Sequence, residues 1–195
     1  MKIEDGLVQN RLEIPHGSWN SEEGLRDSAV LAMLVEKDGA DHLIFNKRRD
    51  DLPYHPGQIC FPGGARDPED HDAMSCALRE TCEEMGIPSD AIAVLGRMSD
   101  RVSIAGFKVA CFVGRLQPGT AYHLEADEVD EAFEVRCEDL LLPDRWGYRD
   151  SNHRLARFKN VPYFNHDETR VVWGLTGIIL RDFVQQVMGW APPVG

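Results

Sequence analysis

The segment from residue 73 to residue 86 constrains the fold more than any other part of the chain, because it has the pattern of one amphipathic helix with a defined end. We expect the helix to run from about residue 72 to residue 85, since Gly86, with Pro88 beyond it, is a typical C-terminal stop. At roughly 100° per residue, one broad face is mostly apolar and the other side carries three glutamates. The face expected to pack inward comprises Met74, Ala77, Leu78, Thr81, Cys82 and Met85.

The three glutamates, Glu80, Glu83 and Glu84, share the polar side of this helix. Glu80 and Glu84 lie one turn apart, with Cβ atoms about 5–6 Å from each other, so their charges repel and destabilise the helix slightly. A solvated acidic face is the simplest interpretation. A divalent cation is the alternative, because Mg²⁺ binds carboxylate oxygens together with waters and phosphate oxygens. Arg79 is beside the glutamates and can hold one of them through its planar guanidinium.

The apolar runs around this helix predict strands on both sides of it. They lie at residues 28–35 and 42–45, joined by a turn at Asp38-Gly39, and at 91–98, 106–116, 131–135, 161–164 and 171–173. Residues 46–64, rich in glycine and proline, are expected to be mostly loop, and residues 176–188 a closing helix. The strands do not alternate regularly with helices, so we expect an α/β (α+β) fold with a mixed β-sheet between helices. Residues 1–25 are expected to be an irregular N-terminal arm and residues 26–195 a single domain.

Composition limits the partners of this chain. Its 21 basic and 33 acidic residues give a formal charge of −12, which disfavours binding to nucleic acid. A small anionic substrate remains compatible, because a metal ion and a local basic cluster can reverse the potential inside one cleft. No window approaches about 18 consecutive apolar residues, and the N-terminus lacks an apolar signal segment, so we expect a cytoplasmic protein that does not bind membranes. The five cysteines have no regular spacing and are expected to be free thiols. The sequence leaves the oligomeric state open.

Residues 79–87, RETCEEMGI, resemble the core of the Nudix box, whose consensus is R-E-U-x-E-E-x-G-U with U a bulky aliphatic residue. Thr81 at the first aliphatic position is a mild departure. The run from Gly64 to Arg79 is one residue longer than usual, and Asp70 stands where a glutamate is expected.

The longer spacing fits a particular subgroup of that family. Residues 48–64, RRDDLPYHPGQICFPGG, resemble the additional signature of the coenzyme A pyrophosphatases, in which an Arg, a Leu, a His-x-Gly-Gln and an FPGG precede the box. Pro53 departs from that signature, since an Arg is common there. Further similarities occur at Glu128-Val129, at residues 133–135 and at residues 173–176, so the resemblance extends over roughly residues 28 to 185.

The resemblance implies an enzyme that uses Mg²⁺ or Mn²⁺ to hydrolyse the diphosphate of coenzyme A, giving 4′-phosphopantetheine and adenosine 3′,5′-bisphosphate. It implies that Glu80 and Glu84 bind the metal, with Glu83 as a third or bridging ligand, and that Arg79 orients a glutamate of the box. For the base that activates water, the candidate is Glu128 in the acidic loop 124–130, with Glu125 behind it. A solvated acidic turn is the alternative interpretation of that loop.

The diphosphate requires positive charge and backbone amides, and the candidates lie mainly upstream of the box. The residues expected to bind substrate are Arg48, Arg49, His55, Gln58, Gly63 and Gly64, and further positive charge is expected from Lys47 and Lys108. For His55, phosphate binding and capping of the loop are both open. Gln58 can bind substrate or brace the loop, and the glycines are expected to provide backbone geometry.

Three alternatives to the coenzyme A pyrophosphatase hypothesis remain open. The same chemistry can act on another nucleoside diphosphate derivative, such as ADP-ribose, NADH or a dinucleoside polyphosphate. A second hypothesis is a nucleotide-binding module of the same fold that has lost catalysis, although all three box carboxylates are present here. A third is an acidic protein-interaction domain with a coincidental motif, which the combined spacing of the box residues disfavours.

Overall fold

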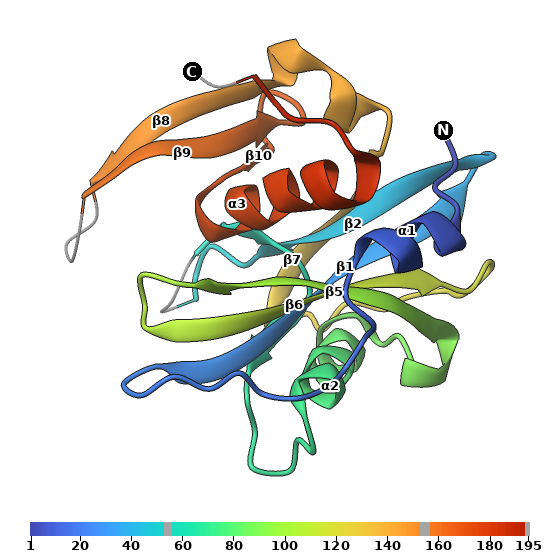
Figure 1. Cartoon of the computed structure of the whole chain (residues 1–195), viewed down its shortest axis with the longest axis vertical. Coiled ribbons are helices and arrows are strands. Elements are labelled where there is room, and N and C mark those ends of the chain that lie inside the picture. Colours follow the sequence, from blue (N-terminus) through green and yellow to red (C-terminus); the bar gives the residue numbers. More distant parts are fainter. Residues whose placement is uncertain (53–55, 153–156, 194–195) are drawn as a thin grey trace.

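The long apolar runs form the strands of a central mixed sheet in the computed structural model, which describes residues 1–52, 56–152 and 157–193 (Figure 1). The sheet has seven strands, with the order β3-β2-β1-β6-β5, while β4 pairs with β1 and β7 with β2. β1 and β6 are parallel and the other pairs are antiparallel. The strands are β1 (Arg26–Lys37), β2 (Ala40–Arg48), β3 (Ile59–Cys60), β4 (Gly63–Ala65), β5 (Ile92–Val102), β6 (Phe107–Leu116) and β7 (Val129–Arg136).

Both faces of this sheet are covered, which explains why its strands are apolar runs and do not alternate apolar and polar residues. Successive residues of β1 enter different cores: Leu31 belongs to the core under one helix, and Ala32 to the core on the opposite face. The same alternation occurs in β6 between Cys111 and Phe112. The predicted fold class, a mixed sheet between helices, is confirmed.

Helix α2 (Ala73–Met85) covers one face of the sheet and has the predicted ends. Asp72 caps its N-terminus by accepting from the backbone N–H of Ser75, whose hydroxyl in turn accepts from the backbone N–H of Asp72. At the other end Gly86 adopts φ 64°, a left-handed conformation that costs glycine little. These two ends fix which residues of the helix face the sheet.

The opposite face is covered by helix α3 (Gly174–Phe183), which packs against β5 and against a second sheet. This three-stranded sheet has the order β10-β9-β8 and consists of β8 (Trp146–Asn152), β9 (Arg157–Asn165) and β10 (Val171–Val172). The sequence pattern did not predict β8, because its polar residues do not alternate with apolar ones. α3 continues into a π-helical turn, η4 (Val184–Met188), and short 3₁₀ turns occur at η1 (Ser89–Ala91), η2 (Asp139–Leu141) and η3 (Pro143–Arg145). No helix of the described ranges has the length and apolar character that crossing a membrane requires.

The N-terminal residues are more ordered than expected. Residues 5–11 form helix α1 (Asp5–Arg11), which packs against β5 and η4. Ile3, Val8 and Leu12 are buried in the main core, and the Arg11 guanidinium donates to the carbonyl of Val187 at 2.7 Å. The expectation of an irregular lead-in is therefore wrong for this segment. A short helix with only a few apolar side chains resembles a polar arm in sequence until its packing partner is known.

The packing of α1 leads to a first prediction. Val8 is fully buried, whereas its neighbour Leu7 is 40% exposed. We expect Val8→Ala to lower the free energy of unfolding by about 2 kcal/mol, because it removes buried apolar surface and leaves a small void. The matched variant Leu7→Ala should change it by less than about 0.5 kcal/mol. Denaturant unfolding followed by circular dichroism measures both, and equal effects would contradict the docking of α1.

Candidate active site

Ala77, Thr81 and Met85 of the predicted inward face of α2 are buried, but one edge of the polar side, at Glu84, also lies against the sheet, which the helical pattern did not predict. Glu84, expected on the exposed face, is 2% exposed, whereas Cys82, expected on the inward face, is exposed. The reason lies in what the helix packs against. Its C-terminal half meets the backbone of β4, where Gly63 and Gly64 have no side chains, so there is room there for carboxylates.

The carboxylate of Glu84 is held in one orientation by two donors on the same oxygen. Its Oε2 accepts from the side-chain amide of Asn46 at 2.9 Å and from the backbone N–H of Gly63 at 3.3 Å. Its Oε1 lies 3.8 Å from an Nη atom of Arg48. Burial, with a smaller contribution from the charge of Glu80, raises the pKa of Glu84 to about 7 against the lowering effect of the hydrogen bonds.

Glu80 lies one turn earlier, against the second glycine of β4. A Cβ atom on Gly64 would lie 2.4 Å from the Oε1 of Glu80, so the glycine leaves the space that this carboxylate occupies. Burial also raises the pKa of Glu80, although a hydrogen bond of 3.0 Å from Arg79 opposes the shift. Glu80 and Glu84 thus form a pair of partly dehydrated, mutually repelling carboxylates beside a glycine backbone.

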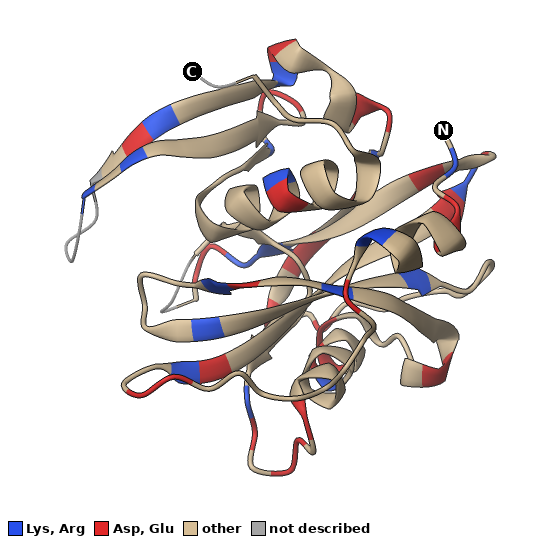
Figure 2. Cartoon of the chain, viewed as in Figure 1, with Lys and Arg blue, Asp and Glu red and all other residues tan. Residues whose placement is uncertain are grey.

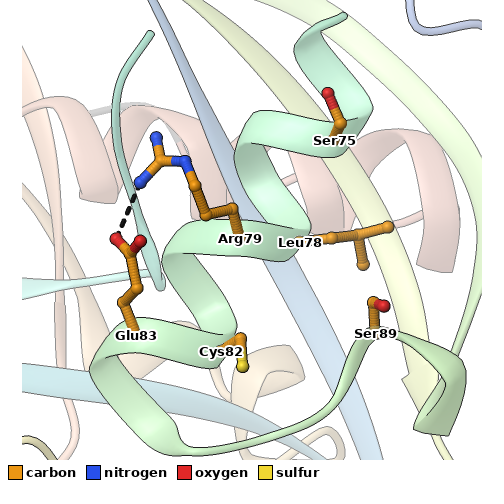
Figure 3. Close-up of a pocket in the computed structure, with 6 residues that line it drawn as sticks. All are labelled: Ser75, Leu78, Arg79, Cys82, Glu83 and Ser89. Carbon is orange, nitrogen blue, oxygen red and sulfur yellow. Dashed lines mark hydrogen bonds and ion pairs between the residues drawn. The ribbon is translucent and has the colours of Figure 1, made fainter. Parts of the chain in front are cut away.

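Arg79 connects the acidic residues around the helix. It makes a two-point contact with Asp70, from Nε to Oδ1 at 2.9 Å and from Nη2 to Oδ2 at 3.0 Å, and a hydrogen bond of 2.7 Å with Glu83. The Arg79 guanidinium lowers the pKa of Asp70. Arg79 and Glu83 lie at a hollow on the outer face of α2 (Figure 3), which is also lined by Ser75, Leu78, Cys82 and Ser89. Glu83 is therefore exposed and bound to Arg79, which also contacts Glu80.

The late acidic loop passes beside this pair. The backbone N–H of Glu125 donates to the carbonyl of Glu84 at 2.9 Å, which ties the loop to the end of α2. The side chain of Glu128 is exposed, and its charge contributes to raising the pKa of Glu80. The structure thus brings Glu128 near the paired carboxylates while leaving its side chain in solvent.

The basic residues expected to meet a diphosphate are mostly engaged by carboxylates. Arg49 forms a two-point contact with Asp51 at 2.8 Å and also donates to the carbonyl of Ala126. Lys47 contacts Asp130 at 3.0 Å, and Lys108 contacts Glu22 at 2.9 Å. Of these basic residues, Arg48 is the one that lies next to the paired carboxylates, because its guanidinium is 3.8 Å from Glu84.

The remaining expected residues belong to the segment that leads into β4. The carbonyl of Gln58 accepts from the backbone N–H of Arg48 at 3.0 Å, which closes the base of the intervening loop. Gly63 has φ 151°, and a Cβ there would lie 2.3 Å from the carbonyl oxygen of Ala29, so only glycine allows β4 to pair so closely. His55 lies outside the described residues.

Two residues that support the site were not assigned by the sequence. Asn46 is completely buried on β2 and holds Glu84, and its Oδ1 has no hydrogen-bond partner among the described residues. Asp70, of uncertain role in the sequence, anchors Arg79. The sequence pattern placed residue 46 at the start of a loop, whereas β2 continues to Arg48, so the burial of Asn46 could not be predicted.

The donor chemistry of the site fits a divalent cation with oxygen ligands. Within the described residues, no group of three or more His, Cys, Asp and Glu side chains is placed to hold a metal ion by itself. Mg²⁺ commonly uses only one or two carboxylates and completes its shell with water and phosphate oxygens. Burial raises the pKa of both Glu80 and Glu84, and the charge of Glu80 also raises that of Glu84, so a cation would stabilise the charged form of both. These two residues would hold it.

Comparisons with known proteins agree with this arrangement. The model of the NUDIX domain matches residues 25–155. NudL of Photorhabdus laumondii subsp. laumondii, an uncharacterized Nudix hydrolase, is 32% identical over 187 residues, which cover 96% of this chain and 98% of the relative. NudL of Yersinia enterocolitica, likewise uncharacterized, is 36% identical over 150 residues, covering 74% of this chain and 73% of the relative.

Solved structures show the same fold. The chain resembles a C. elegans Ap4A hydrolase (TM-score 0.51, 21% identity, 58% of this chain and 83% of the other). It also resembles a MutT/nudix family protein of Enterococcus faecalis (TM-score 0.50, 15% identity, 92% of this chain and 71% of the other). The match of the NUDIX domain model and the two curated relatives show that the chain belongs to the Nudix hydrolase family.

Proposed function

We propose that this Nudix hydrolase cleaves the diphosphate of coenzyme A or its derivatives, with Mg²⁺ or Mn²⁺, into 4′-phosphopantetheine and adenosine 3′,5′-bisphosphate. The observation that supports hydrolysis is the pair of buried carboxylates, Glu80 and Glu84, set against the backbone of Gly63 and Gly64. The resemblance of residues 48–64 to the coenzyme A signature supports the substrate. The proposed domain comprises residues 26–195, and helix α1 from residues 1–25 packs into its core.

The residues of this chain position the reacting groups. Asn46 and the N–H of Gly63 donate to one oxygen of Glu84, Oε2. Its other oxygen, Oε1, is the one that would hold the cation. Arg79 acts as a positioning residue, because its two-point contact with Asp70 fixes the guanidinium that holds Glu80 and Glu83. A bound divalent cation supplies charge neutralisation at the diphosphate and makes water a better nucleophile. Arg48 lies where it can contact a phosphate oxygen next to the carboxylates.

We assign proton removal from the attacking water to Glu128. The reaction adds water across one P–O–P bond, so the base accepts one proton as the oxygen attacks phosphorus. Glu128 is exposed, lies near Glu80, and is carried by a loop that is hydrogen-bonded to the end of α2. Glu83 has a different environment, since its carboxylate is paired with Arg79, and we assign it to the metal ligands once that ion pair opens.

Removing the carboxylate of Glu84 should reduce catalysis while the protein still folds. We expect Glu84→Gln to lower kcat/KM by at least about 10²-fold, because it removes a metal ligand while keeping the shape of the side chain. The exposed residue Glu69 provides the control Glu69→Gln, which should keep full activity. Steady-state kinetics with coenzyme A and thermal unfolding of each variant test this. A folded Glu84→Gln enzyme with near-normal turnover would remove the metal assignment.

The role of Asn46 gives an independent prediction about metal affinity. We expect Asn46→Ala to weaken Mn²⁺ binding by about tenfold or more, because an outer partner that orients a ligand typically contributes that much. Calorimetric titration with Mn²⁺ measures this without substrate. Asn165→Ala, at an exposed position of β9, is the control. If the folded Asn46 variant binds Mn²⁺ as tightly as the wild type, the orientation of Glu84 does not matter for the metal.

The substrate itself is tested with a panel of diphosphates. We expect coenzyme A to be cleaved faster than ADP-ribose, NADH or diadenosine tetraphosphate, and all hydrolysis to stop when EDTA removes the metal. Mass spectrometry of the products from coenzyme A should show 4′-phosphopantetheine and adenosine 3′,5′-bisphosphate. Much faster turnover of ADP-ribose would overturn the substrate, and turnover that persists in EDTA would overturn the metal requirement.

A further inference from the structure

The basic residues of the β8–β9 hairpin differ from those around the paired carboxylates. Lys47, Arg49 and Lys108 are each paired with a carboxylate, as expected in a chain of charge −12. Arg149, Arg157 and Lys159 are exposed and form no ion pair with any residue of the described ranges. Figure 2 shows basic bands on both strands of this hairpin. The described part of the hairpin therefore carries three basic side chains without ion pairs, beside one acidic residue, Asp150.

Arg149 is held in place by aromatic rings. Its guanidinium carbon lies 4.3 Å from the centroid of the Trp173 ring and 5.7 Å from that of Tyr163. Gly147, two residues earlier on β8, leaves the space for Tyr163, because a Cβ there would lie 2.3 Å from the phenol oxygen. Stacking on a ring occupies the face of a guanidinium and leaves the N–H groups at its edge free for an acceptor. Arg149 is thus a preorganised donor.

This cluster is connected to the candidate active site through β10 and β3. Trp173 directly follows β10, which lies beside β3. β3 in turn leads within a few residues into Gly63 and Gly64, against which Glu80 and Glu84 lie. Arg149 thus lies on the second sheet and Glu80 and Glu84 lie on α2. The contact between the short strands β10 and β3 connects these two parts of the molecule.

We propose that Arg149, supported by Trp173 and Tyr163, binds a phosphomonoester of the substrate apart from the diphosphate that is cleaved. This subsite rests on the proposed function, because it presumes a substrate with a diphosphate and a second phosphate group. A phosphomonoester carries up to two charges and three acceptor oxygens, which match the fork of a guanidinium. The acidic residue on the hairpin, Asp150, accepts from the backbone N–H of Asn160 and forms no ion pair with Arg149.

A purely structural role for Arg149 makes a different prediction. If its stacking only fastened the hairpin to the start of α3, removal of the guanidinium would affect stability and not distinguish between ligands. If Arg149 binds a phosphomonoester, removal affects only ligands that carry one. Coenzyme A and 3′-dephospho-coenzyme A differ by that group alone, as do adenosine 3′,5′-bisphosphate and AMP, so these pairs separate the two possibilities.

The test combines ligand binding with kinetics. We expect the wild-type chain to bind adenosine 3′,5′-bisphosphate about tenfold or more tightly than AMP in calorimetric titrations, since a hydrogen-bonded charge pair contributes at least that much. Arg149→Gln should abolish this preference and raise KM for coenzyme A by a similar factor, with kcat and the KM for 3′-dephospho-coenzyme A unchanged. The control is Arg26→Gln, which removes another exposed arginine that lies over a ring, that of Phe107.

The outcomes separate this subsite from the proposed function. A wild-type chain with no preference for adenosine 3′,5′-bisphosphate, or an Arg149→Gln chain that keeps the preference, overturns the subsite even if coenzyme A is cleaved. Loss of the preference in Arg149→Gln supports the subsite even if coenzyme A is not cleaved, in which case the proposed substrate fails alone. Equal effects of Arg149→Gln and Arg26→Gln would show a general charge effect and also overturn the subsite.

Discussion

The burial of the Glu84 carboxylate is the constraint on which the arrangement of the site depends. Removing a carboxylate from water is unfavourable, and this burial is the main cause of the raised pKa of Glu84. The protein offsets part of it with two donors, Asn46 and the N–H of Gly63, on a single oxygen. The N–H of Gly63 is available only because β4 lies against α2 without side chains between them. The glycines, the buried asparagine and the inward glutamates therefore depend on one another.

Arg79 extends this interdependence to the loop before the helix. The run upstream of Arg79 is one residue longer than the consensus, and the acidic partner of Arg79 in it is Asp70. Asp70, shorter than glutamate, reaches the guanidinium from a turn in which it also accepts from the backbone N–H of Asp67 at 2.7 Å. Asp70 is thus held by its own turn and gives Arg79 a fixed partner.

The sequence predicted the elements that are defined by local signals. The Asp38-Gly39 turn, the strands around it and both ends of α2 depend on neighbouring residues, and the structure confirms them. The sequence-based predictions were wrong where contacts with residues far along the chain determine the structure. Hydrophobicity alone placed Cys82 inward and Glu84 outward, because the helical pattern contains no information about the glycine backbone that receives the carboxylate. The packing of α1 and the pairing of β8 depend equally on contacts far along the chain.

The same reasoning applies to the basic residues. Their number and their positions in the sequence do not show which of them form ion pairs with carboxylates. Lys47, Arg49 and Lys108 looked available for a phosphate, but each lies within hydrogen-bond distance of an acidic side chain, as a large excess of carboxylates makes probable for any surface cation. A paired cation offers an anion little net attraction until the pair opens. An acidic chain that binds a phosphorylated ligand therefore needs cations kept away from carboxylates. Stacking on an aromatic ring, as for Arg149 on Trp173, achieves this, since it holds the guanidinium without neutralising its charge.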